Sequence, residues 1–204
     1  MKLFKTVRNQ KGFTLIELAI VLVIIGIILG AVLKGQDLIE NARYKRLTTE
    51  IKQWETATWA YLDRKGYFPG DSDEYGKIDG TIAGDVKTAF GASGLSNAPT
   101  TNTLTLGSAS FYIFLGNASA KKNVIAVCVI GDCGTAFGND ITYAENVDLS
   151  IDGTIDGTAG LVRGLDSVVG ANSAAWNING AGTSYAAWTS ASTRGLLYFF
   201  DKKP

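Results

Sequence analysis

An uninterrupted apolar stretch near the N-terminus constrains the fold of this chain more than any other feature. Residues 18–33 contain no charged side chain. Taken as a helix, Phe13 to Leu33 would extend about 32 Å at roughly 1.5 Å per residue, enough to cross a bilayer core of about 30 Å. A secretory signal usually has a shorter apolar region followed by a cleavage site. The simplest interpretation of the stretch is therefore a single-pass membrane anchor.

The residues at the start of this stretch do not fit a plain anchor. The preceding segment is short and basic, with no acidic residue, as expected on the cytoplasmic side; its charged residues are Lys2, Lys5, Arg8 and Lys11. Glu17 follows, at the edge of the apolar stretch. A carboxylate in hydrocarbon is costly and needs a partner. A single isolated anchor would leave Glu17 without one, so its presence indicates a second role.

From Lys11 to about Leu33 the sequence resembles the type IV pilin and type II secretion pseudopilin superfamily, whose leader ends in glycine before a Phe-Thr-Leu-Ile-Glu start. The resemblance implies that a prepilin peptidase removes residues 1–12 by cutting after Gly12 and methylates the new amino terminus on Phe13. It implies that residues 13–33 hold the precursor in the inner membrane and later pack in a filament. There Glu17 would neutralise the N-terminal ammonium of an adjacent subunit, and such a buried pair fixes register.

The helix is predicted to continue beyond the membrane as an amphipathic half over residues 34–65. One helical face carries residues at steps of three and four, which should pack on something; they are Leu47, Ile51, Trp54, Thr58 and Tyr61. No proline occurs between Phe13 and Lys65, so one continuous helix is possible. Many pilins carry a proline in the apolar part, whereas this chain has Gly26, Gly30 and Gly35 there. These glycines either loosen the helix locally or permit close helix packing.

Residues 66–204 are predicted to form one globular α+β head. Pro69-Gly70 ends the helix, and residues 71–103 form an irregular connection. Ile78, Ile82, Val86 and Phe90 recur there at steps of four, which suits a short helix or nothing. Strand signals follow from Leu104, in residues 111–115, 124–130 and 195–200. The expected fold is pilin-like, a long N-terminal helix packed on a small antiparallel β-sheet.

Cys128 and Cys133 are the only cysteines, and the chain has no histidine. In an exported domain an even count favours one structural disulfide, here closing a tight loop, and a pair of buried free thiols is the alternative. This composition does not suit an ordinary zinc site or haem attachment.

An aspartate-rich run over residues 148–157 is a candidate calcium loop. Asp148, Asp152 and Asp156 fall four apart, and two Asp-Gly pairs could supply oxygen ligands. The run lacks the alternating acids and terminal glutamate of an EF-hand. Asp-Gly is also a common turn that needs no metal, so both interpretations stay open. The end of the run, with Gly160, Val162 and Arg163, resembles a stretch in some pilin-like proteins.

Residues 164–194 are rich in small and polar residues, with Trp176, Tyr185 and Trp188 between them. They form either an exposed surface that meets partners or loops whose aromatic residues fill the core.

Composition narrows the possible functions. Cleavage would remove four of 19 basic residues and leave 15 against 19 acidic residues, a net charge of about −4, which argues against bulk nucleic-acid binding. No nucleophile motif, phosphate-binding loop or suitable carboxylate pair indicates an enzyme. Three functions remain: a pilin in a homopolymeric or mixed surface filament, a pseudopilin of a periplasmic type II secretion pseudopilus, and a monomeric membrane-anchored binding module.

Overall fold

The computed structural model describes residues 12–71, 76–79, 85–118, 122–167, 170–181 and 185–201, with only the backbone for residues 179–181. Apart from Gly12, the predicted leader lies outside these residues, as does Ile82. The chain divides into two compact units, residues 1–42 and 43–204.

One helix, α1 (Leu15–Lys65), runs without a break for 51 residues. This confirms the continuous helix that the absence of proline predicts. Its buried residues include every member of the predicted face and also Ala57; they are Leu47, Ile51, Trp54, Ala57, Thr58 and Tyr61. All of them belong to the second unit, where they form part of the main hydrophobic core together with residues of the β-sheet.

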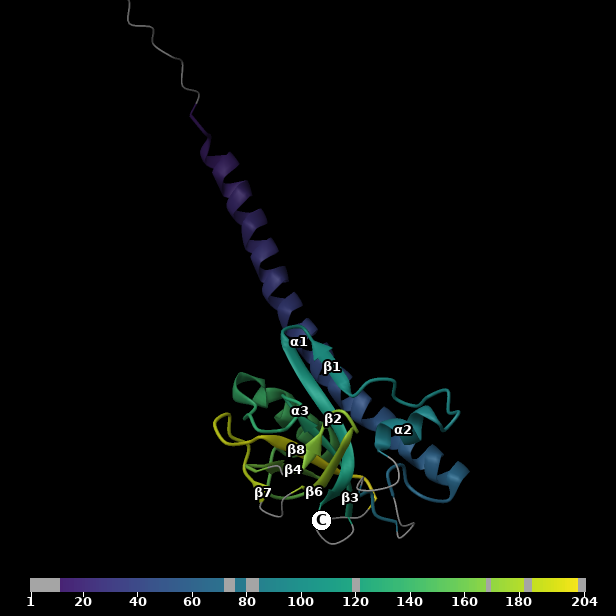
Figure 1. The fold of residues 1–204 in the computed structure, drawn as a ribbon. Helices are drawn as coiled ribbons and strands as arrows, with labels where there is room; N and C mark the ends of the chain where they lie inside the picture. The colour runs from purple at the N-terminus through teal and green to yellow at the C-terminus, as the bar shows by residue number, and fades with distance from the viewer. Residues whose placement is uncertain are drawn as a thin grey trace, which may run out of the picture. The chain divides into compact units, whose positions relative to one another are not determined.

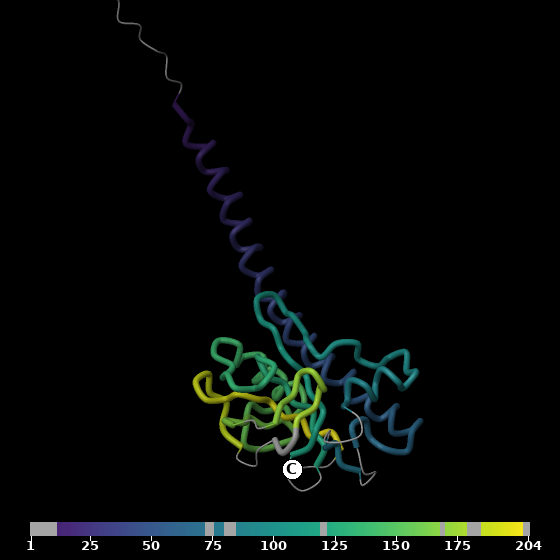
Figure 2. The backbone as a smooth tube through the Cα atoms, viewed as in Figure 1, coloured from purple at the N-terminus to yellow at the C-terminus, as the bar shows by residue number. Residues whose placement is uncertain are grey.

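The second unit is built around an eight-stranded sheet with the order β5-β6-β2-β3-β8-β4-β7, and β1 pairs with β2 beside this path (Figure 1). The strands are β1 (Thr103–Leu106), β2 (Ala109–Ala118), β3 (Lys122–Cys128), β4 (Val162–Leu165), β5 (Ala171–Asn172), β6 (Asn177–Ala181), β7 (Tyr185–Ala186) and β8 (Gly195–Phe199). Every pairing is antiparallel except that of β2 with β6, which is parallel. Strand β8 lies between β3 and β4 in the sheet. Figure 2 shows the path of the backbone, coloured by residue number. The mostly antiparallel α+β fold confirms the expected class.

Both faces of the central strands are buried, which explains their continuous apolar sequences. On β2, Phe111, Ile113 and Leu115 join the core that contains α1, whereas Phe114 joins a second core on the opposite face. Successive strand residues point to opposite faces, so a two-sided core requires apolar residues at every position. The strands predicted at residues 111–115, 124–130 and 195–200 are therefore present, although β3 ends at Cys128.

The structure contains a helix that the sequence analysis missed. Helix α3 (Ile141–Asp152) follows a 3-10 turn at Gly138–Asp140 and buries Tyr143, Ala144 and Val147. It ends at Gly153, whose φ of 77° is the left-handed conformation that glycine adopts easily at a helix C-terminus. The prediction that residues 148–157 form a single loop is therefore wrong, because the loop begins only after Asp152.

The connection between α1 and β1 contains one short helix, α2 (Val86–Gly91). Asp85 caps its start by accepting a hydrogen bond from the Thr88 N–H. Ile78 lies outside any helix and is fully buried. Of the four residues with this spacing, Val86 and Phe90 lie in a helix and Ile78 does not.

Candidate processing and assembly site

The predicted cleavage site lies just before α1. Gly12, Phe13 and Thr14 are exposed and precede the first helical residue, Leu15. The Phe13 side chain is 85% exposed. A peptidase needs an accessible backbone outside regular secondary structure, and this segment offers one.

Thr14 and Glu17 form a reciprocal pair of contacts at the start of the helix. The Glu17 carboxylate accepts hydrogen bonds from the Thr14 backbone N–H and from the Thr14 hydroxyl, both at 2.8 Å. The Glu17 N–H donates in return to the Thr14 hydroxyl at 3.3 Å. This is a capping box, which satisfies N–H groups that have no partner within the helix.

The capping box corrects one premise of the sequence analysis. Glu17 was expected to lack a partner in a single chain, but Thr14 supplies one. The presence of Glu17 therefore does not by itself exclude a monomeric anchor. The sequence Thr-x-x-Glu before an apolar run is the signal that could have identified this contact.

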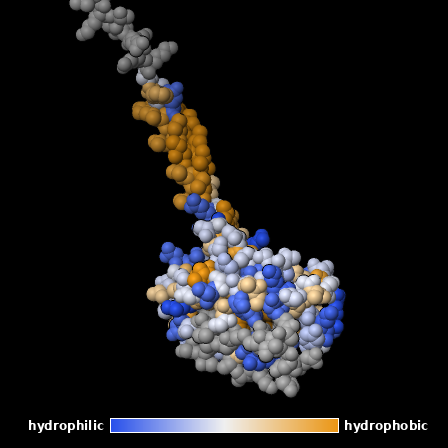
Figure 3. Space-filling view, in the orientation of Figure 1, coloured by the Kyte–Doolittle hydropathy of each residue, from blue (hydrophilic) through white to orange (hydrophobic). Residues whose placement is uncertain are grey.

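The apolar part of α1 is exposed along its whole length. Figure 3 shows its hydrophobic side chains gathered on one segment. Within the described part of the chain, α1 is the one helix long and apolar enough to cross a membrane, and the apolar window is 0% buried. Gly26, Gly30 and Gly35 lie within this helix, and apart from adjacent residues and the helix's own backbone no atom lies within 4 Å of where a Cβ would stand. The structure shows neither a break nor a packed neighbour at these glycines.

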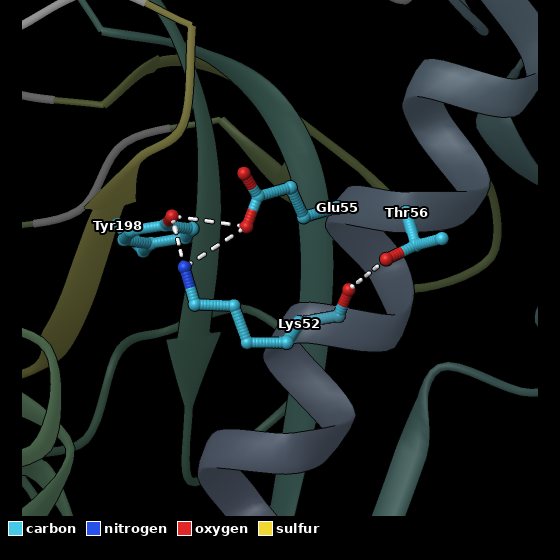
Figure 4. A network of polar contacts seen from close by, with 4 residues as sticks. All are labelled: Lys52, Glu55, Thr56 and Tyr198. Atoms are coloured by element: carbon cyan, nitrogen blue, oxygen red, sulfur yellow. Dashed lines mark hydrogen bonds and ion pairs between the residues drawn. The ribbon is translucent and has the colours of Figure 1, made fainter.

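Within the second unit, a polar network ties α1 to β8 (Figure 4). Lys52 donates to the Tyr198 hydroxyl, which donates to Glu55 at 2.9 Å, and Lys52 and Glu55 form an ion pair at 3.0 Å. The Lys52 ammonium also lies 4.2 Å from the centre of the Tyr198 ring. Burial alone lowers the pKa of Lys52, but its hydrogen bonds to Tyr198 and Glu55 outweigh burial and raise the pKa. Local sequence patterns do not reveal this network, because it joins residues 146 positions apart.

The two cysteines form the predicted disulfide. Cys128 and Cys133 are bonded, with their Cα atoms 5.2 Å apart. Both are fully buried in the second core, and Cys133 follows a tight turn in which its N–H donates to the Ile130 carbonyl. The bond fixes the end of β3 to the turn that follows it.

The three candidate calcium ligands are hydrogen-bond acceptors for the chain around them. Asp148 accepts from the Asp156 N–H, Asp152 accepts from two N–H groups at the start of β4, and Asp156 accepts from Thr158. Among the residues that the structure describes, no three acidic, histidine or cysteine side chains are grouped to hold a metal ion. A calcium site stays a prediction without support from this geometry.

The aromatic side chains in residues 164–194 lie within the two cores or against them. Trp176 is 6% exposed, and its ring lies 5.8 Å from that of Trp54 on α1. The Trp188 indole N–H donates to Asp148 at 2.7 Å, and Tyr185 packs on Phe199 at 6.0 Å between ring centres. The core-filling interpretation therefore holds for Trp176, whereas Trp188 and Tyr185 are half-buried and pack against the two cores.

Comparison with known families matches residues 7–33 to the prokaryotic N-terminal methylation motif. The match begins within the basic leader and ends with the apolar run, so it covers Gly12, Phe13 and Glu17. Neither the comparison with curated proteins nor that with solved structures gave a significant match. The matched residues all precede the head. At residues 7–33 the chain carries the prepilin-type cleavage and methylation motif of type IV pilins and pseudopilins.

Proposed function

We propose that this chain is a structural subunit of a type IV pilus-like filament, processed after Gly12 and assembled through its N-terminal helix. The supporting observation is the combination of the methylation motif with an exposed apolar helix beginning just after the cleavage site. The motif belongs to proteins that build filaments, which fits a structural role better than an enzymatic one.

The exposed helix needs an apolar environment, which would be the membrane before assembly and the filament after it. Its large apolar side chains from Leu15 to Leu33 are all at least 46% exposed. Removing apolar surface from water lowers the free energy by roughly 25 cal/mol per Å². Burial of this helix surface, in a membrane or against other subunits, is therefore strongly favoured. In the precursor the inner membrane would cover it, and in the filament neighbouring copies or related subunits would cover it. The filament would lie outside the cell.

In the filament, Glu17 would pair with the methylated ammonium on Phe13 of an adjacent subunit. Cleavage creates this positive charge next to Thr14 and leaves the Thr14 N–H in place. The charge would otherwise enter an apolar environment unpaired, which is strongly unfavourable. Pairing would therefore favour subunits aligned in one register.

Replacing the glycine before the cleavage site tests processing. Gly12→Leu should leave the leader attached, keep the chain in the membrane fraction and abolish filaments. Val32→Leu is the control, because it keeps an exposed apolar side chain in the same helix and leaves the cleavage site and the glycines unchanged. If Gly12→Leu still yields filaments, cleavage at this bond is not required and the proposal fails.

Location separates the two kinds of filament. Under native expression, electron microscopy of sheared surface material should show filaments containing this chain if it is a pilin. If the processed chain is confined to the periplasm and its loss blocks protein secretion, it is a pseudopilin. A chain that stays monomeric in the membrane contradicts both.

A further inference from the structure

A pocket of about 400 Å³ opens on the head between α2, the segment that follows it and the turn before β6. Its apolar lining includes Phe90 and Trp176, which are almost fully buried, and Leu95 and Pro99, which are half-buried. Lys87 is exposed, and it alone is charged among the described residues that line the pocket. An apolar hollow of this size with a few polar groups is typical of small-molecule sites.

Trp176 is held in the pocket by an unusual backbone conformation. Its φ of 59° is a left-handed value that few residues other than glycine adopt. The Trp176 carbonyl accepts from the Leu115 N–H of β2 at 3.0 Å, and the Ala175 carbonyl accepts from the Lys87 N–H at 3.2 Å. Such strained residues persist where the surrounding structure imposes them, and they are concentrated at ligand sites. The second hydrogen bond also ties α2, with Lys87, to the turn that carries Trp176.

The opposite wall of the pocket is fixed by hydrogen bonds around Ser93. Arg64 of α1 donates to the Ser93 carbonyl at 3.3 Å and to the Gly94 carbonyl at 3.0 Å. The Ser93 hydroxyl donates to the Phe90 carbonyl at 2.6 Å and accepts from the Leu95 N–H at 3.1 Å. The wall is therefore formed in the free chain, and a ligand would not have to order it on binding.

The charge of Lys87 is not neutralised by the chain around it. Its ammonium lies 6.0 Å from the centre of the Trp176 ring. Among the residues that the structure describes, no carboxylate lies within ion-pair distance of Lys87. Asp85, the nearest acidic residue in the sequence, instead caps α2 by accepting from a backbone N–H of that helix. A positive charge at the edge of an apolar pocket attracts anions and repels cations.

We propose that this pocket binds a small organic anion, a carboxylate attached to an apolar ring. The ring packs against Trp176, Phe90 and Leu95, and the carboxylate pairs with the Lys87 ammonium. The hydroxyl groups of Ser96 and Thr100, which also line the pocket, provide further polar contacts. The site lies within residues 43–204, so the inference is independent of filament assembly.

The size and charge of the pocket distinguish this ligand class from others. A volume of about 400 Å³ suits one ring or two fused rings with an acid group, and it is too small for a folded partner. A cationic ligand would meet the Lys87 charge at the rim. A neutral apolar ligand would fill the lining but leave that charge without a partner. The carboxylate therefore provides the specificity that a neutral ligand lacks.

Isothermal titration calorimetry with indole-3-acetate and indole-3-acetamide tests the ligand class, because the two probes share a ring and differ in charge. The full chain is titrated in detergent micelles, and the heats from micelles alone are subtracted. The acetate should bind about tenfold more tightly than the amide, the effect of one hydrogen bond to a charged group. Equal affinities would show that the pocket does not select anions and would overturn the proposal, as would the absence of binding by both probes.

Lys87→Met assigns the charge preference to this side chain, because methionine keeps an apolar stem and removes the ammonium. It should weaken indole-3-acetate binding about tenfold and leave indole-3-acetamide binding unchanged. Lys45→Met is the matched control, because it removes another exposed lysine, from α1 and outside the pocket lining. Unchanged acetate affinity in Lys87→Met, or an equal loss in Lys45→Met, contradicts the proposed contact.

Nuclear magnetic resonance of the tryptophan indole N–H groups tests where the probe binds. The chain has four tryptophans, and the spectrum of Trp176→Phe identifies the Trp176 signal. Indole-3-acetate should shift this signal in the wild type and leave those of Trp59 and Trp188 in place, because neither of these two lines the pocket. A shift confined to Trp59 or Trp188 would place the anion elsewhere on the head and overturn the assignment.

Discussion

Glu17 combines a local contact with the proposed role in assembly. Its carboxylate accepts two hydrogen bonds from Thr14, and its negative charge would meet an ammonium from another subunit. Glutamine fits the same capping box but carries no charge. The chemistry of a single side chain therefore allows the two roles to be separated by substitution.

We expect Glu17→Gln and Glu17→Ala to reduce filament yield to similar extents, because both remove the charge. Thr14→Ala should retain assembly, because it removes only the hydroxyl of the cap and leaves the Thr14 N–H to Glu17 bond in place. Filament mass in sheared fractions, normalised to processed chain in the membrane, measures the effect. Normal assembly of Glu17→Gln would show that capping suffices and that the charge pair is not needed.

Tyr198 links the sheet to α1 through its hydroxyl. Tyr198→Phe keeps the ring over Lys52 but removes the hydroxyl that contacts Lys52 and Glu55. We expect a loss of about 1 kcal/mol in the free energy of unfolding, the typical net value of a hydrogen bond. Chemical denaturation measures this change. Tyr198→Phe should cost less unfolding free energy in a chain that already carries Lys52→Met. Independent, additive effects would mean that the two residues are not coupled.

At the scale of elements, strong apolar patterns were predictable and weak ones were not. Helix α1 and strands β2, β3 and β8 follow from long runs of apolar residues with clear turns at their ends. Helix α3 was missed because asparagine, aspartate, serine and threonine are interspersed among its apolar residues, and these residue types are common in loops. Its buried residues nevertheless show helical spacing, from Tyr143 and Ala144 to Val147.

The remaining strands could not be inferred from local sequence because their partners lie far away in the chain. Strand β6 pairs in parallel with β2, about 60 residues earlier, and β5 and β7 have only two residues each. Strands of two residues are too short to give a sequence pattern, and they form because neighbouring strands offer hydrogen bonds. The candidate sites differ in the same way. The capping box involves only four consecutive residues and can be predicted from local sequence, whereas the Lys52 network depends on the tertiary fold.

The disulfide belongs to the element scale, since it fastens the end of β3 to the following turn. Replacing both cysteines, Cys128→Ala with Cys133→Ala, should lower the free energy of unfolding by about 2 kcal/mol, the loop-closure contribution for so short a loop. Denaturation with and without reductant measures this. The wild type should lose stability when reduced, and the variant should not respond. Equal stability of wild type and variant would contradict a stabilising bond.

The whole molecule contains two units with different requirements. The unit of residues 43–204 contains a sheet with two buried cores, whereas the apolar part of residues 1–42 has its side chains exposed. Residues 43–204 thus enclose cores of their own, whereas the exposed apolar side chains of residues 1–42 need a membrane or other subunits to cover them. The methylation motif at residues 7–33 fits these requirements, because prepilin-type precursors are cut and their helices then move from the membrane into a filament.

Intact-mass spectrometry of the chain in sheared filaments tests this central claim most directly. The account predicts a chain that begins at Phe13, carries one N-terminal methyl group and retains the Cys128–Cys133 disulfide. A filament-borne chain that still begins at Met1 would contradict it.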